Sequence, residues 1–260
     1  MDIPLYQIDA FASQLFTGNP AAVCPLDEWL ADELMQSIAT ENNLSETAFF
    51  VPQGDGSYRI RWFTPASEVD LCGHATLASA YVLFHMLGHR EEQIRFHSRS
   101  GVLSVARDED WLTLDFPAQP PVACEIPDAV LSAFSATPTE CLQSEDLMVV
   151  FDRQSEVEAA APDFGQLMRI ESRGIIITAP SSQWDFVARF FAPRYGIPED
   201  PVTGSAYTQL VPYWASRTGK KRFRAKQVSA RGGELTCQLA GDRVFISGKA
   251  TRYLEGTIRI

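Results

Sequence analysis

The feature that most constrains this chain is an internal repeat. The segment RWFTPASEVDLCG, which begins at Arg61, is similar to RFFAPRYGIPEDP, which begins at Arg189, at a constant offset of 128 residues. Further along, RSGVLSV at 99–105 matches RGGELTC at 231–237, and the offset there is 132. Because this period is too long for one unit of a solenoid, the repeat predicts two similar halves whose alignment contains a single four-residue slip.

Local patterns predict the same kinds of element in both halves. A helix is expected after the strand–proline–loop segment of each half, at 74–87 and 201–217, and an amphipathic surface helix at 29–43. Small residues open the first two of these helices, which suits a helix enclosed by a sheet. Strands are expected at 58–63, 102–106, 174–180, 186–191 and 243–247. Neither a βαβαβ alternation nor a GxGxxG motif is present, so a dinucleotide-binding fold is excluded.

Composition narrows the class of protein. The chain has 260 residues, 45% of them hydrophobic, and a formal net charge of -11, which disfavours nucleic acid as a partner. No apolar stretch approaches the roughly 18 residues of a membrane span, and the N-terminus does not resemble a signal peptide. Five scattered cysteines without zinc-site spacing predict a reduced, cytoplasmic protein without a bound metal.

Glu46 breaks the repeat, because its counterpart at the offset of 128 is Gly174. Glu46 leads directly into the apolar run 48–51. It is either a solvated residue at the end of a strand or a partly desolvated carboxyl group. A desolvated carboxyl group is a candidate general acid or base near neutral pH.

The two helix starts differ in a second way. At the same offset Cys72 corresponds to Asp200 and His74 to Val202. Asp200 followed by proline predicts a helix that begins there, with the aspartate as N-cap. One explanation of Asp200 is that it only caps that helix, without a catalytic role. Cys72, taken alone, is typical of a small buried hydrophobic residue. A helix N-terminus disfavours imidazolium, so His74 is expected to be neutral and able to donate or accept a proton.

Two helix starts in matched halves predict one anion site. Unpaired N–H groups at a helix N-terminus carry partial positive charge and bind carboxylates. If a pseudo-two-fold axis relates the halves, both N-termini point into one cleft. Backbone donors at Gly73, His74, Gly204 and Ser205 would then hold a small carboxylate-bearing substrate beside Glu46.

Four segments resemble the phenazine-biosynthesis PhzF-like family, which shares its fold with diaminopimelate epimerase. They are FTGNPAAVC (16–24), SETAFF (45–50), EVDLCGHATLASA (68–80) and EDPVTGSA (199–206). The resemblance covers nearly the whole chain. It implies an α+β fold of two domains, each a barrel-like mixed sheet around a central helix. The domains are expected at 1–116 and 121–254, joined by the proline-rich stretch 115–122, with 255–260 returning to the first.

The resemblance also implies a cofactor-independent isomerase. The implied catalytic acid/base is Glu46, with His74 and Asp200 as partners in proton transfer and substrate orientation. The implied substrate-binding positions are Asn19, Ser45, Gly73, Gly204 and Ser205. The family is compatible with a homodimer. Diaminopimelate epimerase uses one cysteine at each helix start, whereas this chain has Cys72 and Asp200, which speaks against a two-thiol epimerase.

Two other classes of protein stay open on the sequence. One is a thiol hydrolase built on Cys72 and His74, although catalytic partners normally come from separate segments. The other is a small-acid binding protein on the same scaffold, which would bind a ligand without exchanging its protons with solvent.

Overall fold

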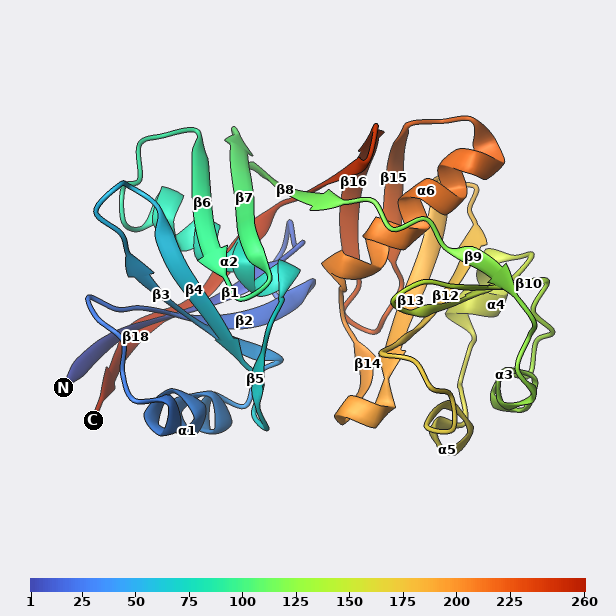
Figure 1. Cartoon of the computed structure of the whole chain (residues 1–260), viewed down its shortest axis with the longest axis horizontal. Helices are drawn as coiled ribbons and strands as arrows, with labels where there is room; N and C mark the ends of the chain where they lie inside the picture. Colours follow the sequence, from blue (N-terminus) through green and yellow to red (C-terminus); the bar gives the residue numbers. More distant parts are fainter. The chain divides into compact units, whose positions relative to one another are not determined.

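The computed structural model describes residues 1–260 and divides into two compact units (Figure 1). The first unit comprises Met1–Asp115 and Ser247–Ile260, and the second comprises Phe116–Ile246. In each unit, parallel and antiparallel strands combine with few helices, which gives a mixed α/β architecture. The two units are described separately below.

The first unit is built on a ladder of strands of both directions. Strand β1 pairs antiparallel with β18 and β2, β2 pairs parallel with β3, and β3 pairs antiparallel with β4. Beyond β4 the ladder continues through a parallel β6 and antiparallel β7 and β8. The elements are β1 (Asp2–Ala10), β2 (Asn19–Pro25), α1 (Asp32–Asn42), β3 (Glu46–Pro52), β4 (Tyr58–Phe63), β5 (Glu68–Val69), α2 (Gly73–His85), β6 (Gln93–Ser98), β7 (Gly101–Asp108), β8 (Trp111–Pro117) and β18 (Ala250–Arg259).

Helix α2 lies in the interior of the first unit. Every residue from Gly73 to Ala80 is buried, and the helix contacts β1, β2, β3, β7 and β18. A helix that is buried all round needs small side chains wherever a strand comes close. Ala75, Ala78 and Ala80, each 0% exposed, meet that need.

The second unit repeats this arrangement. Strand β10 pairs antiparallel with β9 and β11, β11 pairs parallel with β12, and β12 pairs antiparallel with β13. A parallel β15 and an antiparallel β16 follow. The elements are β9 (Val122–Cys124), α3 (Asp128–Ala133), β10 (Glu140–Gln143), β11 (Leu147–Val150), α4 (Gln154–Glu158), α5 (Phe164–Leu167), β12 (Ile175–Pro180), β13 (Phe186–Ala192), the 3-10 turn η1 (Pro193–Tyr195), β14 (Ile197–Asp200), the 3-10 turn η2 (Gly204–Ala206), α6 (Tyr207–Thr218), β15 (Arg222–Gln227), β16 (Gly233–Ala240) and β17 (Arg243–Gly248).

The repeat in the sequence is a repeat in strand register. Phe49 of β3 pairs with Arg61 of β4, and Ile177 of β12 pairs with Arg189 of β13. Both arginines then bind a glutamate through two nitrogens. Arg61 Nε lies 2.7 Å from Glu68 Oε1, and Arg189 Nε lies 2.7 Å from its own glutamate, Glu199. The matched residues therefore keep the same framework contacts in the two halves.

The structure corrects the expectation of a single four-residue slip. Because Glu68 and Glu199 occupy equivalent positions, the second half already gains residues between β13 and β14, where η1 lies. The turn between β15 and β16 is also longer than its counterpart: Gln227 pairs with Gly233, whereas Ser98 pairs with Gly101.

These insertions change the correspondence at the helix starts. Residue for residue from the equivalent glutamates, Cys72 matches Thr203 rather than Asp200, and His74 matches Ser205 rather than Val202. Asp200 instead matches Val69, since each pairs with the equivalent strand, through Phe190 and Trp62 respectively.

The C-terminal strand belongs to the first unit. All of β18 lies beside β1, from the pair Asp2–Arg259 to the pair Ala10–Ala250. The sequence predicts this return only for residues 255–260, whereas the structure places the unit boundary at Ser247. The sequence of β18 does not reveal this pairing, because its partner β1 lies at the opposite end of the chain.

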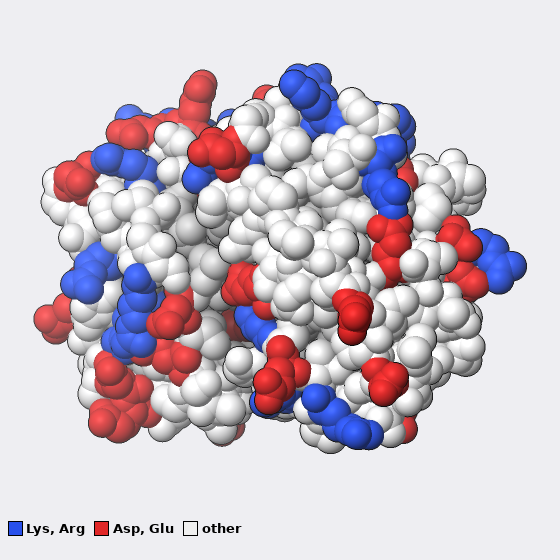
Figure 2. Space-filling model, turned by 45° about the vertical axis from the view of Figure 1, so that its right-hand side comes forward, with Lys and Arg blue, Asp and Glu red and all other residues white.

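The surface carries charges of both signs. In the view of Figure 2, acidic and basic side chains are interspersed among larger uncharged areas, and no continuous basic face is visible. None of the helices combines the length and the apolar character that crossing a membrane would require.

Candidate active site

Three chain segments of the first unit bring polar side chains together. Asn19 opens β2, Glu46 opens β3, and His74 lies in the first turn of α2. The parallel pairing of β2 with β3 sets Glu46 opposite Ala21, two residues after Asn19. All three side chains are buried: Asn19 is 0% exposed, His74 5% and Glu46 9%. Polar groups this deep need partners, and here they partner one another.

Helix α2 begins as the sequence predicts. Cys72 is its N-cap residue, with an extended backbone (φ -144°, ψ 109°), but no side chain caps the helix. The first N–H groups of the helix therefore have no capping partner from Cys72. Gly73 is the first residue of the helix, His74 follows it directly, and both are buried.

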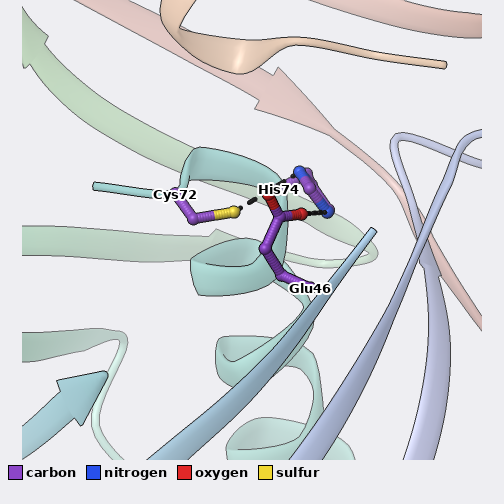
Figure 3. A group of neighbouring side chains, drawn as sticks. All are labelled: Glu46, Cys72 and His74. Atoms are coloured by element: carbon purple, nitrogen blue, oxygen red, sulfur yellow. Dashed lines mark hydrogen bonds and ion pairs between the residues drawn. The ribbon is translucent and has the colours of Figure 1, made fainter. Parts of the chain in front are cut away.

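His74 contacts a different group at each ring nitrogen (Figure 3). Its Nε2 lies 3.0 Å from Glu46 Oε2, and its Nδ1 lies 3.5 Å from Cys72 Sγ. Asn19 Nδ2 is also near Nδ1, at 3.3 Å, and Ser45 Oγ donates a hydrogen bond to Asn19 Oδ1 at 3.0 Å. Glu46, His74, Asn19, Ser45 and Cys72 thus form one connected cluster.

The close pair of His74 and Glu46 is not a regular hydrogen bond. Nε2 and Oε2 are at ion-pair distance, yet neither atom has a partner with hydrogen-bond geometry. Buried polar atoms without a well-aligned partner are uncommon and often mark functional sites. The contact between these two atoms is therefore a candidate for proton transfer.

Electrostatics in the cluster shift the pKa of His74. Burial lowers the pKa of His74, but the negative charges of Cys72 and Glu46 raise it, and the net shift is upward. Burial, followed by the charge of Glu46, raises the pKa of Cys72 to about 11. Because that thiol is neutral near pH 7, Glu46 is the group whose charge raises the pKa of His74 there. Asn19 Nδ2, a donor, faces His74 Nδ1, which must be unprotonated to accept from it. The expectation of a neutral imidazole therefore stays a prediction, with Nε2 as the nitrogen that carries the proton.

Glu46, Cys72 and His74 also form the one cluster of acidic, cysteine and histidine side chains that could hold a metal ion. The ligand atoms of Glu46, Cys72 and His74 lie within 4.8 Å of one another. However, Cys72 Sγ and Glu46 Oε2 approach opposite nitrogens of the imidazole. A single ion faces only one ring nitrogen, and it needs a thiolate rather than a thiol. The arrangement suits proton transfer better than coordination.

The predicted residues of the second unit lie around a loop rather than a helix start. Asp200 is the last residue of β14, and α6 begins at Tyr207 after the turn η2. The predicted helix over 201–217 is therefore confirmed from residue 207 onward, but its predicted start with Asp200 as N-cap is wrong. Asp200 accepts a hydrogen bond from Thr203 Oγ1, and its carbonyl accepts one from Gln227 Nε2 at 2.8 Å. Gly204 and Ser205 lie within η2.

Sequence reasoning missed a partly buried ion pair beside Ser205, in which Asp146 is buried and Arg173 is partly exposed. Arg173 Nε lies 2.9 Å from Asp146 Oδ1, and Arg173 Nη2 donates to Ser205 Oγ at 3.1 Å. Asp146 is 0% exposed and also accepts from Gln209 Nε2 at 2.8 Å. The sequence carried a signal for this pair. Arg173 stands shortly before an apolar strand, as Ser45 does in the first half. Asp146 directly precedes the apolar run 147–151.

Comparisons with known proteins identify the family and the fold. A profile of the PhzC–PhzF family, described as phenazine biosynthesis-like protein, matches residues 8–256. An uncharacterized isomerase of Pseudomonas aeruginosa is 54% identical over 260 residues, which cover 100% of both chains. A crystal structure of a PhzF-family protein from Enterococcus faecalis has a TM-score of 0.98 at 45% identity, again with 100% of both chains covered.

A more distant structure shares the fold alone. A hydroxyproline epimerase from Agrobacterium vitis, solved with bound trans-4-hydroxy-L-proline, has a TM-score of 0.64 at 12% identity. The match covers 99% of this chain and 92% of that one.

Proposed function

The chain belongs to the PhzC–PhzF phenazine biosynthesis-like family and is an isomerase, and from that premise we propose that Glu46 moves a proton on a small carboxylate-bearing metabolite. The observation that carries the proposal is the buried contact between Glu46 and His74, in which neither facing atom has a regular hydrogen bond. The carboxylate removes a proton from a carbon of the substrate and returns it to another carbon or to the other face.

The residues around Glu46 have complementary roles in this proposal. His74 holds the Glu46 side chain in place through Nε2, 3.0 Å from Oε2, and exchanges a proton with it during the reaction. The uncapped N-terminus of α2 at Gly73 offers backbone N–H groups to a carboxylate, and such donors stabilise negative charge that develops in the transition state. A positioned acid or base of this kind contributes about 10²–10⁴-fold to the rate.

Asn19 and Ser45 act on His74 rather than on the substrate alone. Ser45 donates to the Asn19 carbonyl, which fixes the amide and points its nitrogen at His74 Nδ1. This chain of contacts orients the imidazole so that Nε2 faces Glu46. Asp200, Gly204 and Ser205 stay predictions as further catalytic and substrate-binding residues.

The substrate class rests on two lines of support. The helix N-terminus of α2 suits a carboxylate, and the hydroxyproline epimerase of the same fold holds a small amino acid. We extend this to a small carboxylic acid for the present chain. We also infer the finer architecture that the resemblance implies, a barrel-like sheet around a central helix in each unit, since residues 207–214 of α6 are buried as α2 is.

The test is exchange of substrate hydrogen with solvent. The protein is incubated in deuterated water with trans-4-hydroxy-L-proline, diaminopimelate or an anthranilate-like dihydro acid, and label is followed by NMR and mass spectrometry. We expect the wild type to label at least one acid. Glu46→Gln should label it at least about 100-fold more slowly, because the amide cannot accept the proton.

The matched control is Glu41→Gln, an exposed glutamate five positions earlier, which should label at the wild-type rate. Equal labelling by Glu46→Gln and the wild type would remove Glu46 from the mechanism. Binding of an acid without any labelling by the wild type would favour the small-acid binding protein. The NMR position of the label separates racemisation at one carbon from movement of a double bond.

A further inference from the structure

Two cysteines of the second unit lie directly opposite each other on neighbouring strands. In the antiparallel pair of β9 and β10, Cys124 is the register partner of Cys141. Side chains at such positions share a face of the sheet, with Cβ atoms about 4.5–5.5 Å apart. A disulfide needs Cα atoms about 4.4–6.8 Å apart, which both kinds of antiparallel pair provide. The backbone therefore already presents the two thiols to each other.

The two thiols differ in exposure. Cys124 is exposed at the end of β9, whereas Cys141 is 3% exposed and packs in the core cluster that includes Val130 and Phe134. Burial, and then the charge and hydrogen bond of Cys124, raise the pKa of Cys141 to about 12. Cys141 is thus a protonated, shielded thiol, and Cys124 is the accessible one. The remaining cysteines, Cys24, Cys72 and Cys237, are all buried.

We propose that Cys124 and Cys141 form a reversible thiol–disulfide pair that reacts with small disulfides of the oxidised-glutathione type. The Cys124 thiolate attacks one sulfur of the small disulfide, forms a mixed disulfide and releases one small thiolate. Cys141 then loses its proton and attacks Cys124 Sγ, which forms the intrachain bond and releases the second small thiolate. The two cysteines lose two electrons, and the small disulfide gains both.

The order of attack follows from exposure. Only a thiolate is nucleophilic, and the reagent reaches the exposed sulfur first. The second step is intramolecular but needs the buried Cys141 thiol to ionise, so it is the slower step and becomes faster as the pH rises. The bond would close residues 125–140 into a loop and fasten the short strand β9 to β10.

The experiment treats the folded wild-type protein with oxidised glutathione, alkylates the remaining thiols with N-ethylmaleimide and maps the digested peptides by mass spectrometry. We expect two of the five thiols to be lost, a link between the peptides that contain Cys124 and Cys141, and full recovery of both thiols with dithiothreitol. The three other cysteines should carry the alkylating label after unfolding.

Two variants identify the role of each sulfur. Cys141→Ser should accumulate glutathione on Cys124, because no second thiol can displace it. Cys124→Ser should neither lose thiols nor gain glutathione, because Cys141 is shielded. Cys141→Ala replaces Cys141→Ser if the buried hydroxyl prevents folding. Far-ultraviolet circular dichroism establishes that each variant is folded.

The proposal is overturned if the wild type stops at a glutathione adduct on Cys124. It is equally overturned if Cys124 links two copies of the chain, if Cys141 bonds to a different cysteine, or if no thiol is lost. A rate of intrachain bond formation that does not rise with pH would contradict the assigned order of the two attacks.

Discussion

The first and second halves of this chain share a framework but differ in what they place upon it. Strand β3 begins with Glu46, whereas the equivalent position before β12 is Gly174. The reason lies across the ladder: a Cβ built on Gly174 would come within 2.1 Å of the Phe190 ring. A side chain at Gly174 is excluded by Phe190, while in the first half the equivalent site holds a buried carboxylate.

A different polar cluster occupies this part of the second half. Arg173 and Asp146 form a partly buried pair there and hold Gln209 and Ser205, where the first half has Ser45, Asn19 and His74. The framework contacts, by contrast, are kept, as in the pairs Arg61–Glu68 and Arg189–Glu199. The comparison teaches that the repeated ladder preserves the fold, and that chemistry diverges at the ends of strands and helices.

The largest expected effect comes from breaking the second-half cluster. Asp146→Asn should lower the free energy of unfolding by about 2–3 kcal/mol, because the fully buried Asp146 loses its charge-assisted hydrogen bonds with Arg173, which keeps only Glu145 and Asp200 as acidic neighbours. Urea denaturation followed by tryptophan fluorescence measures the change. Glu255→Gln, which breaks the exposed pair Arg252–Glu255, is the control and should leave stability unchanged. Equal effects of the two variants would refute a structural role for the pair of Asp146 and Arg173.

A second test addresses Gly174, the position at which the second half lacks the glutamate of the first. Gly174→Ala should lower the free energy of unfolding by about 2 kcal/mol, since the new methyl group collides with a buried ring and forces it to move. The same denaturation experiment applies. Gly54→Ala is the control, because a Cβ there meets nothing within 4 Å. An undiminished stability of Gly174→Ala would mean that Phe190 does not bar a side chain from this position.

The local sequence predicted the elements whose limits depend on neighbouring residues alone. Strand β4 (Tyr58–Phe63) has the predicted limits, and Glu46 begins a buried strand as expected. The predicted helix start at Asp200 failed because Gln227, 27 residues later, holds the Asp200 carbonyl and the Thr203 N–H in a loop. A distant glutamine that is 1% exposed leaves no trace in the local pattern of capping residues.

The candidate site was predictable in part for the same reason. Repeat-breaking residues and the family resemblance pointed to Glu46, His74 and Asn19, and the structure places these three in contact. The Arg173–Asp146 pair joins two segments 27 residues apart through packing alone. Finding it requires knowing that β11 and β12 run parallel, so that the residues before them meet at one edge.

A smaller effect is expected in the pH dependence of stability. The pKa of folded His74 lies above the unfolded value of about 6.5, so protonated His74 stabilises the fold. That contribution is complete below about pH 6.5 and is lost as pH rises through the folded-state pKa. We therefore expect the wild type to lose stability with rising pH relative to His74→Gln, as measured by urea denaturation at several pH values.

Two variants make that measurement specific. Glu46→Gln should remove most of the dependence, because Glu46 supplies the charge that raises the pKa of His74. His97→Gln changes an exposed histidine and should keep the wild-type dependence. A wild-type slope that persists in His74→Gln would assign the effect to another group and would contradict the raised pKa of His74.

The smallest effect is expected at Cys72, and it decides between two classes of enzyme. Burial and the charge of Glu46 raise the pKa of this thiol to about 11, so it is a poor nucleophile near pH 7. Cys72→Ala should therefore keep most of the isomerase activity in the deuterium-labelling assay. Loss of a true nucleophile lowers turnover by about 10⁴-fold or more, which is the result that a thiol hydrolase built on Cys72 and His74 requires. Iodoacetamide treatment gives an independent reading, because the buried Cys72 should stay unmodified while the exposed Cys124 reacts.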